Sequence, residues 1–381
     1  MLDTTPSGWI LASRYMRTNF YGVMLPLRLD GVDNSAIPAN LEDPAAGVDR
    51  TSMGALSGTG YVPEIWIMAP VSGSNIVRFR TPLNTVSTLK LQCEKVTFTP
   101  DVLNTADQQI QISGNATTTE DVQPVLKLGN QVESQSVPLK IKVMKKRIVR
   151  LALHKVIGLD ENGLQTSPSN FPTKVELEDY LNKIYGRQVN TYFSVTVYEE
   201  KGQNGLGIDF DDNNDKRINP TRLDSELIAA TPNSKSQALG AAAEANIDVW
   251  IIGGGVKLGL NSILGMRIQD TFAGVGKLII DGELAGISRS AERKKIILIN
   301  TIAHEIGHVM IADGHPDTDG PVAVLRWKQS INGISKDQRD QQRLMYSKET
   351  LFLPGEQLIK KEWDNIEEWL NLEEMQQRII N

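Results

Sequence analysis

The chain has 381 residues, and its 40 Lys and Arg against 46 Asp and Glu give a formal net charge of −6. This acidic balance argues against a nucleic-acid binder that relies on a basic surface, and no apolar run is long enough to predict a transmembrane helix. The single cysteine excludes an internal disulfide framework and a CxxC metal or redox motif. The N-terminus shows no cationic start followed by an apolar block, so no signal peptide is visible.

The first 146 residues predict an all-β region after an irregular start. Residues 1–60 are rich in Pro, Gly, Asp and Ser, which favours an irregular N-terminal segment. From residue 61, short alternating segments predict strands at 64–68, 75–80, 88–93, 95–98, 109–112 and 139–143. Many short strands separated by turn residues indicate a β-sandwich-like (immunoglobulin-like) accessory domain over 61–146.

The remainder, from residue 147, mixes strands and helices. Strands are predicted at 148–156, 188–198, 248–252 and 277–280, and a helix is expected from Pro172 to Gly186. His154 falls in the first of these strands, away from the other histidines. We interpret it as a packed or surface strand residue, not a metal ligand.

An acidic loop lies between these elements. The oxygen-bearing side chains Asp209, Asp211, Asn213 and Asp215 alternate there and could converge on Ca²⁺. The Gly and the bidentate Glu of an EF-hand loop are missing, so a solvated acidic loop is favoured over a structural calcium site.

A helix with a metal-binding motif is predicted after the last strand. Ser288 or Ser290 is the expected N-cap, and apolar residues recur from 296 to 310, which indicates a buried helix. Residues 304–308 spell H-E-x-x-H. His304 and His308 are one turn apart and project from one face, where two imidazoles can take adjacent corners of a zinc tetrahedron.

The same motif predicts hydrolysis of an amide. Glu305 is rotated away from direct ligation and is expected to take the proton of a zinc-bound water, as general base and then acid. The alternative, a helix whose histidines hydrogen-bond inside the core, is disfavoured because the motif is rare by chance. His315 is the expected third ligand, after the helix-breaking Gly314, and Asp313 stays open as the alternative.

Thirty residues beyond His315 the chain contains Leu344-Met345-Tyr346. With H-E-x-x-H and the third His, this triplet resembles the metzincin zinc metallopeptidases, in which a Met-turn lies beneath the metal. The resemblance implies that Met345 is the turn methionine and that Tyr346 lies near the wall of the substrate pocket. It differs in one respect, because His315 follows His308 by seven residues instead of six. We therefore expect the active-site helix to run about one turn longer.

The resemblance implies an α+β fold for residues 147–381, with a mixed twisted sheet, an active-site helix and a C-terminal helix predicted from about residue 355. In metzincins strand, helix and three strands precede the active-site helix, and an edge strand binds extended peptide. The resemblance places this edge at 276–287.

The function expected from the resemblance is that of a zinc-dependent endopeptidase acting on protein or peptide, secreted or extracytoplasmic by analogy with the family. Three alternatives stay open: a gluzincin with a later Glu as third ligand, another zinc amidohydrolase, and a non-catalytic module with a residual zinc site. Nothing in the sequence predicts the oligomeric state.

Overall fold

The computed structural model describes two compact units, which are treated separately. One unit comprises residues 1–146, 183–191 and 314–364, and the other comprises 147–182, 192–313 and 365–381. The residues described are 10–11, 26–31, 48–49, 53–55, 61–63, 65–80, 89–103, 107–115, 120–122, 125–128, 135–136, 139–160, 162–201, 206–209, 217–218, 246–253, 257–258, 265–268, 276–282, 290–311, 344–345, 356, 358 and 360–372.

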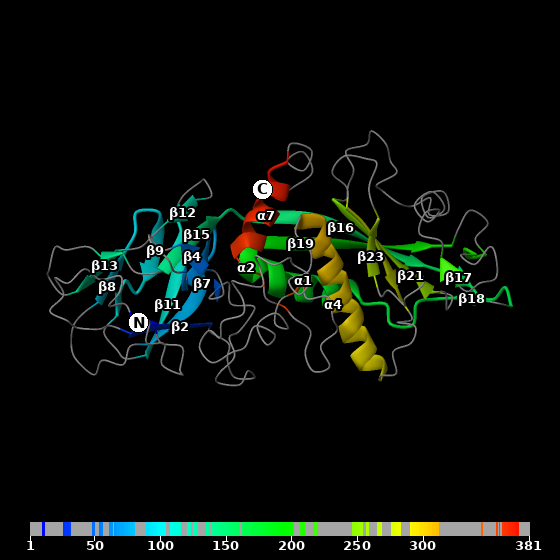
Figure 1. Ribbon diagram of the computed structural model, residues 1–381. Helices are drawn as coiled ribbons and strands as arrows, with labels where there is room; N and C mark the ends of the chain where they lie inside the picture. The colour runs from blue at the N-terminus through cyan, green and yellow to red at the C-terminus, as the bar shows by residue number, and fades with distance from the viewer. Residues whose placement is uncertain are drawn as a thin grey trace. The chain divides into compact units, whose positions relative to one another are not determined.

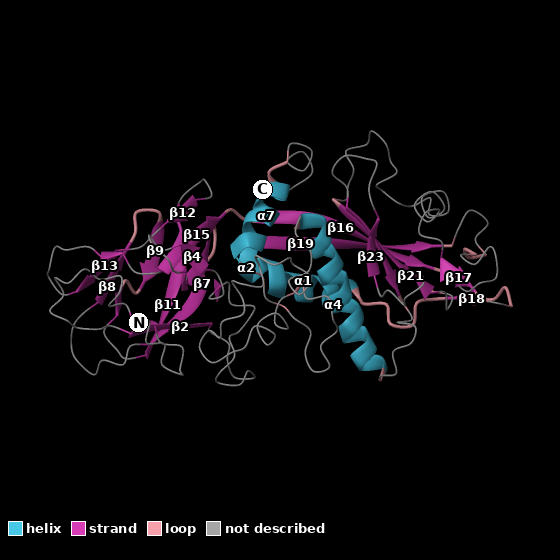
Figure 2. Cartoon of the chain, viewed as in Figure 1, coloured by secondary structure: helices cyan, strands magenta, loops and turns pink. Residues whose placement is uncertain are grey.

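The first unit contains three sheets (Figures 1 and 2). An antiparallel five-stranded sheet has the order β1 (Ile10–Leu11), β2 (Pro26–Gly31), β7 (Asn75–Arg80), β11 (Asp107–Gly114) and β9 (Val96–Thr99). An antiparallel four-stranded sheet has the order β10 (Val102–Leu103), β8 (Leu89–Gln92), β13 (Val125–Leu128) and β14 (Gln135–Ser136).

The third sheet has the order β12 (Glu120–Val122), β15 (Leu139–Met144), β6 (Ile65–Pro70) and β3 (Val48–Asp49), and β15 runs parallel to β6. A small hairpin pairs β4 (Met53–Ala55) with β5 (Tyr61–Pro63). All six strands predicted in this region are present. In β9 the apolar and polar residues alternate as the strand predicts, since Val96 and Phe98 are buried while Thr97 and Thr99 are exposed.

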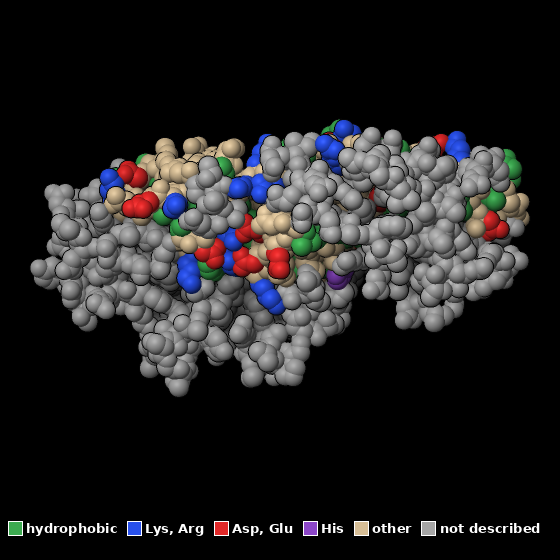
Figure 3. Space-filling view, turned by 90° about the horizontal axis from the view of Figure 1, so that it is seen from above, with side chains coloured by type: hydrophobic (Ala, Val, Ile, Leu, Met, Phe, Trp, Pro, Cys, Tyr) green, Lys and Arg blue, Asp and Glu red, His purple; other side chains and the backbone are tan. Residues whose placement is uncertain are grey.

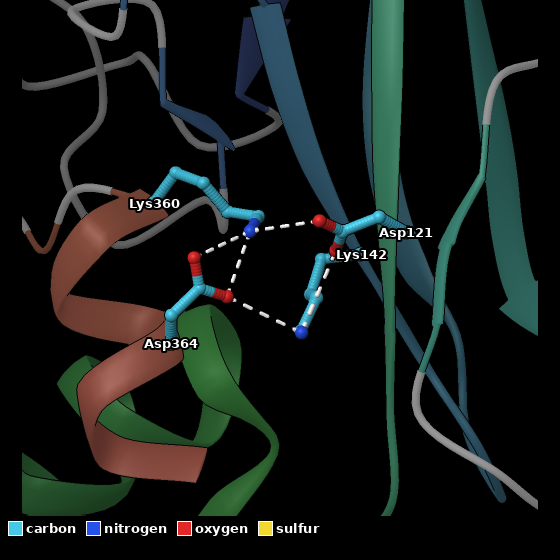
Figure 4. Close-up of polar contacts among 4 residues, drawn as sticks. All are labelled: Asp121, Lys142, Lys360 and Asp364. Atoms are coloured by element: carbon cyan, nitrogen blue, oxygen red, sulfur yellow. Dashed lines mark hydrogen bonds and ion pairs between the residues drawn. The ribbon is translucent and has the colours of Figure 1, made fainter. Parts of the chain in front are cut away.

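Two buried lysines join the start of helix α7 (Lys360–Leu370) to the third sheet of this unit. Lys360 Nζ lies 2.6 Å from Asp364 Oδ2 and 3.1 Å from Asp121 Oδ2, and Lys142 Nζ lies 3.2 Å from Asp364 Oδ1 (Figure 4). Lys360 Nζ also lies 4.3 Å from the centre of the Trp66 ring. Each buried ammonium group therefore has carboxylate partners, as burial of a charge requires. On the face in Figure 3 the coloured acidic and basic side chains are interspersed.

The second unit is built on one five-stranded sheet. Its order is β19 (Thr191–Glu200), β16 (Arg147–Val156), β21 (Ile247–Ile252), β24 (Gly276–Asp281) and β23 (Gly265–Ile268). β21 pairs in parallel with β16 and β24, and β23 is antiparallel to β24. Two-stranded ladders join β17 (Gly158–Leu159) to β18 (Gln165–Thr166), and β20 (Arg217–Ile218) to β22 (Lys257–Leu258).

The helices begin where capping residues were available. α1 (Lys174–Leu181) is preceded by Thr173, whose hydroxyl accepts from the Glu176 N–H while the Glu176 carboxylate accepts from the Thr173 N–H. A π-helical turn, η3 (Asn182–Gly186), and α2 (Arg187–Val189) continue the segment, so it extends past the predicted end at Gly186. α4 (Ala291–Met310) packs against α1, β23 and β24 (Figure 1).

The strand predicted to be the peptide-binding edge is not an edge. β24 pairs with β21 on one side and with β23 on the other, and β23 is the outermost of the five strands. The prediction for 276–287 is therefore wrong for 276–281, the strand part of that range. The physical reason is the strand order, because β23, which precedes β24 in the chain, pairs with the side of β24 that faces away from β21.

Candidate metal centre

Helix α4 carries the H-E-x-x-H motif, and local sequence explains why it forms. The Ser290 hydroxyl accepts a hydrogen bond from the Arg293 N–H at 3.3 Å, so one of the two predicted N-caps is confirmed. The acidic Glu292 in the first turn complements the positive end of the helix dipole. The apolar face is buried through Ile297, Leu298, Ile299, Ile302, Ala303 and Ile306. α4 is thereby fixed on the sheet, and its last two turns present the motif.

His304 and His308 lie together near the end of α4, each half-buried. Their ring centres are 4.8 Å apart and the ring planes are inclined by 84°. Two imidazoles bound to one tetrahedral zinc, each with a Zn–N distance near 2.1 Å, have ring centres about 5 Å apart. The observed distance of 4.8 Å between the ring centres is close to this value.

Glu305 follows His304 in the chain and is buried, with 7 % of its surface exposed. Burial raises the pKa of its carboxyl to about 8, because the charged form loses its hydration. In the metal-free protein this carboxyl is therefore mostly protonated near neutral pH, a form that cannot act as a base. A divalent cation held by the neighbouring histidines would favour the charged carboxylate and lower this pKa.

The helix ends earlier than predicted. Its last residue is Met310, and Ile311 is extended, with φ −116° and ψ 116°, while its N–H donates to the Gly307 carbonyl at 2.7 Å. The prediction that the helix continues for about one more turn is therefore wrong. Ile311 is 2 % exposed, and a buried β-branched residue is compatible with extended backbone.

The other predicted members of the centre lie mostly outside the described residues. This holds for His315, Asp313 and Tyr346. Leu344 and Met345 form a turn, as predicted, and are 2 % and 0 % exposed. The placement of Met345 beneath a metal stays a prediction. Within the described ranges no group of three or more His, Cys, Asp or Glu side chains converges on a metal position.

The calcium prediction is equally open. Asp209 is exposed, and Asp211, Asn213 and Asp215 lie outside the described residues.

In the described part of the chain no helix has the length and apolar character required to cross a membrane, as the sequence predicted.

A buried cluster around His154 was missed by sequence reasoning. His154 is 0 % exposed, and its Nδ1 lies 2.9 Å from Glu200 Oε1 while its Nε2 lies 2.7 Å from Asp248 Oδ1. The ring is stacked on Trp250 at 4.9 Å and on Tyr198 at 5.3 Å between ring centres. Burial alone would lower the pKa of His154, but the hydrogen bonds and charges of the two carboxylates outweigh it and raise the pKa. The one signal in the sequence was a carboxylate, Asp248, inside an apolar strand.

Comparisons with known proteins supply little further information. No protein-family model matches the chain. No curated protein matches it. Two solved structures with some similarity are a 2,6-sialyltransferase of Vibrionaceae Photobacterium sp. JT-ISH-224, in complex with CMP and lactose, and a sialyltransferase from Photobacterium damsela.

The first has a TM-score of 0.19 and 11 % identity over 51 % of this chain and 34 % of its own. The second has a TM-score of 0.18 and 8 % identity over 50 % of this chain and 36 % of its own. The matches thus span about a third of those proteins' length, and at these TM-scores the likeness carries no argument.

Proposed function

We propose that the chain is a zinc-dependent endopeptidase of metzincin type. One observation carries the proposal: His304 and His308 lie one helical turn apart with ring centres 4.8 Å apart, and the buried Glu305 follows the first of them. This combines two nitrogen donors for a metal with a buried carboxyl group directly beside them in the chain.

The residues would divide the work as follows. His304 and His308 hold the zinc, with His315 as third ligand. The metal, when bound, acts as a Lewis acid that polarises the scissile carbonyl and makes water more acidic. Glu305 takes the proton of the attacking water and delivers it to the leaving amine. Met345 is the turn methionine and Tyr346 borders the substrate pocket.

The succession of elements in the second unit supports the proposal. When the two-stranded ladders β17–β18 and β20–β22 and the short turns η3 and α2 are set aside, the order is β16, α1, β19, β21, β23, β24 and α4. The resemblance implies a strand, a helix, three strands and the active-site helix, so the main sheet has one additional strand. β23 is the outermost strand of the sheet and packs against α4. We assign to β23 the pairing with an extended peptide that was expected of the following strand.

Further parts of the proposal concern the surroundings of the enzyme. A secreted or extracytoplasmic location belongs to it. The loop at residues 209–215 is taken as a solvated acidic loop, with a structural Ca²⁺ site as the alternative. Binding of nucleic acid is not expected, because the net charge is −6.

The test is metal analysis combined with cleavage of an unfolded protein substrate. We expect one zinc per chain and cleavage that a chelator abolishes and zinc restores. Glu305→Gln should keep the zinc and lose activity by about 10²–10⁴-fold, the usual contribution of a general base. Glu292→Gln, on the exposed first turn of the same helix, is the matched control and should retain activity.

Other outcomes lead to the alternatives. Zinc without hydrolysis of any peptide would indicate a non-catalytic module, and hydrolysis of a non-peptide amide alone would indicate another zinc amidohydrolase. A protein that binds no zinc would overturn the proposal. Loss of zinc in His315→Ala but not in Asp313→Ala would identify the third ligand, and the reverse result would exchange the two. If both variants retain zinc, a later Glu becomes the candidate, as in a gluzincin.

A further inference from the structure

The cluster of Glu200, His154 and Asp248 joins three neighbouring strands of the second unit. His154 comes from β16, Glu200 from the end of β19 and Asp248 from β21, and all three are 0 % exposed. These residues lie outside α4 and its motif, so the proposed hydrolysis does not use them.

We propose that this cluster holds His154 as an imidazolium ion through neutral pH, and that loss of its proton at alkaline pH destabilises the second unit. The cluster is thus a proton-dependent lock between β19, β16 and β21.

A neutral imidazole has one N–H donor and one acceptor nitrogen. Both ring nitrogens of His154 nevertheless face carboxylate oxygens, at 2.9 Å and 2.7 Å. A carboxylate can only accept, so a neutral ring would place two acceptors against each other at one of these contacts. The imidazolium donates at both, and each bond is then assisted by charge.

The aromatic neighbours favour the same state. The His154 ring is nearly parallel to Trp250, at 13°, and to Tyr198, at 21°. A cation over an aromatic face is attracted by the electrons of that face, and the attraction is larger away from water.

The surrounding charges also favour a retained proton. The titratable groups that face His154 in the described residues are Glu200 and Tyr198 from β19 and Asp248 from β21. Asp248 Oδ2 is buried without a hydrogen-bond partner, so loss of the His154 proton would leave a poorly solvated negative charge at Asp248. Lys277 of β24 is the register neighbour of Asp248 and is the nearest cationic position on the next strand.

The sign of the pH dependence follows from proton binding. The folded protein keeps the proton on His154, whereas an unfolded histidine releases it near pH 6.5. The stabilisation is therefore complete below about pH 6.5 and is lost as the pH rises through the raised pKa of the folded state. Within that window the unfolding equilibrium constant should increase up to tenfold per pH unit.

The first experiment observes the proton directly. In protein labelled with ¹⁵N in its four histidines, both ring nitrogens of His154 should show imidazolium shifts at pH 7. The signals are assigned by elimination with His304→Gln, His308→Gln and His315→Gln, so the assignment does not require a variant of the cluster to fold. A neutral ring at pH 7 would overturn the proposal.

The second experiment measures urea unfolding of the protein between pH 6.5 and 9.5. Asp248→Asn should make the pH dependence of the unfolding free energy shallower than that of the wild type, because its amide can donate to Nε2 of a neutral ring while Nδ1–H donates to Glu200. Glu199→Gln is the matched control, since Glu199 is half-exposed and pairs with Lys155 and Lys201. It should keep the wild-type slope. An Asp248→Asn slope equal to that of the wild type would also refute the lock.

Discussion

Replacing Glu305 by glutamine should stabilise the metal-free protein, and increasingly so as the pH rises. Burial raises the pKa of this carboxyl from 4.5 to about 8, so the folded state binds its proton more tightly than the unfolded state does. The contribution of Glu305 to the stability of the wild-type protein is therefore complete below about pH 4.5 and is lost as the pH rises through about 8. Glutamine does not titrate, so the variant escapes this loss.

The magnitude follows from the two pKa values. Each pKa unit corresponds to about 1.4 kcal/mol, so the rise from 4.5 to about 8 costs the wild type up to about 5 kcal/mol at alkaline pH. Between pH 5 and pH 9 the advantage of Glu305→Gln over the wild type should grow by about 4 kcal/mol. Comparing the two proteins across pH cancels the fixed cost of burying an amide and the titration of the histidines.

The assay is urea unfolding of chelator-treated protein at pH 5, 7 and 9 with linear extrapolation. Glu292→Gln is the control, because it removes a carboxylate from the exposed first turn of the same helix. That change should cost about 0.3–1 kcal/mol through the helix dipole and leave the pH dependence unchanged. Equal pH profiles for Glu305→Gln and the wild type would refute the reasoning. Bound zinc should reduce the difference, since a cation beside Glu305 favours its charged form.

Two further predictions concern backbone positions. Asn190 has φ 51° and donates from Nδ2 to two backbone carbonyls at 2.8 and 3.2 Å. Asn190→Ala should lower the free energy of unfolding by about 2–4 kcal/mol, and Asn190→Gly should lower it measurably less, because glycine keeps the left-handed conformation. Equal losses of the two variants in urea unfolding would contradict this account. A Cβ at Gly253 would lie 2.8 Å from the carbonyl oxygen of Thr166, so Gly253→Ala should lower the free energy of unfolding by about 1–3 kcal/mol. Gly73→Ala is the control and should be almost neutral, because the nearest atom to its Cβ would lie at 3.9 Å. Similar thermal midpoints for the two variants would show that the close approach at Gly253 is relieved at little cost.

Local patterns in the sequence were sufficient for most of the longer elements, whereas the strands within residues 1–60, a segment predicted to be irregular, and most strands of two to four residues were not predicted. The alternation of apolar and polar residues located the six predicted strands of the first unit, and the long apolar run with Ser290 before it located α4. The spacing of His304 and His308 placed both on one face of that helix. These features are local, because side-chain periodicity and capping depend on residues only a few positions apart.

Other features required the tertiary structure. The early end of α4 at Met310 accompanies burial of Ile311. The outer position of β23 depends on which strand pairs with β21, and that strand is β24. The contacts of His154 join residues 46 and 94 positions away. Strand order, register and burial are set by pairing between distant segments, so no local pattern could show that an isolated histidine lies between two buried carboxylates.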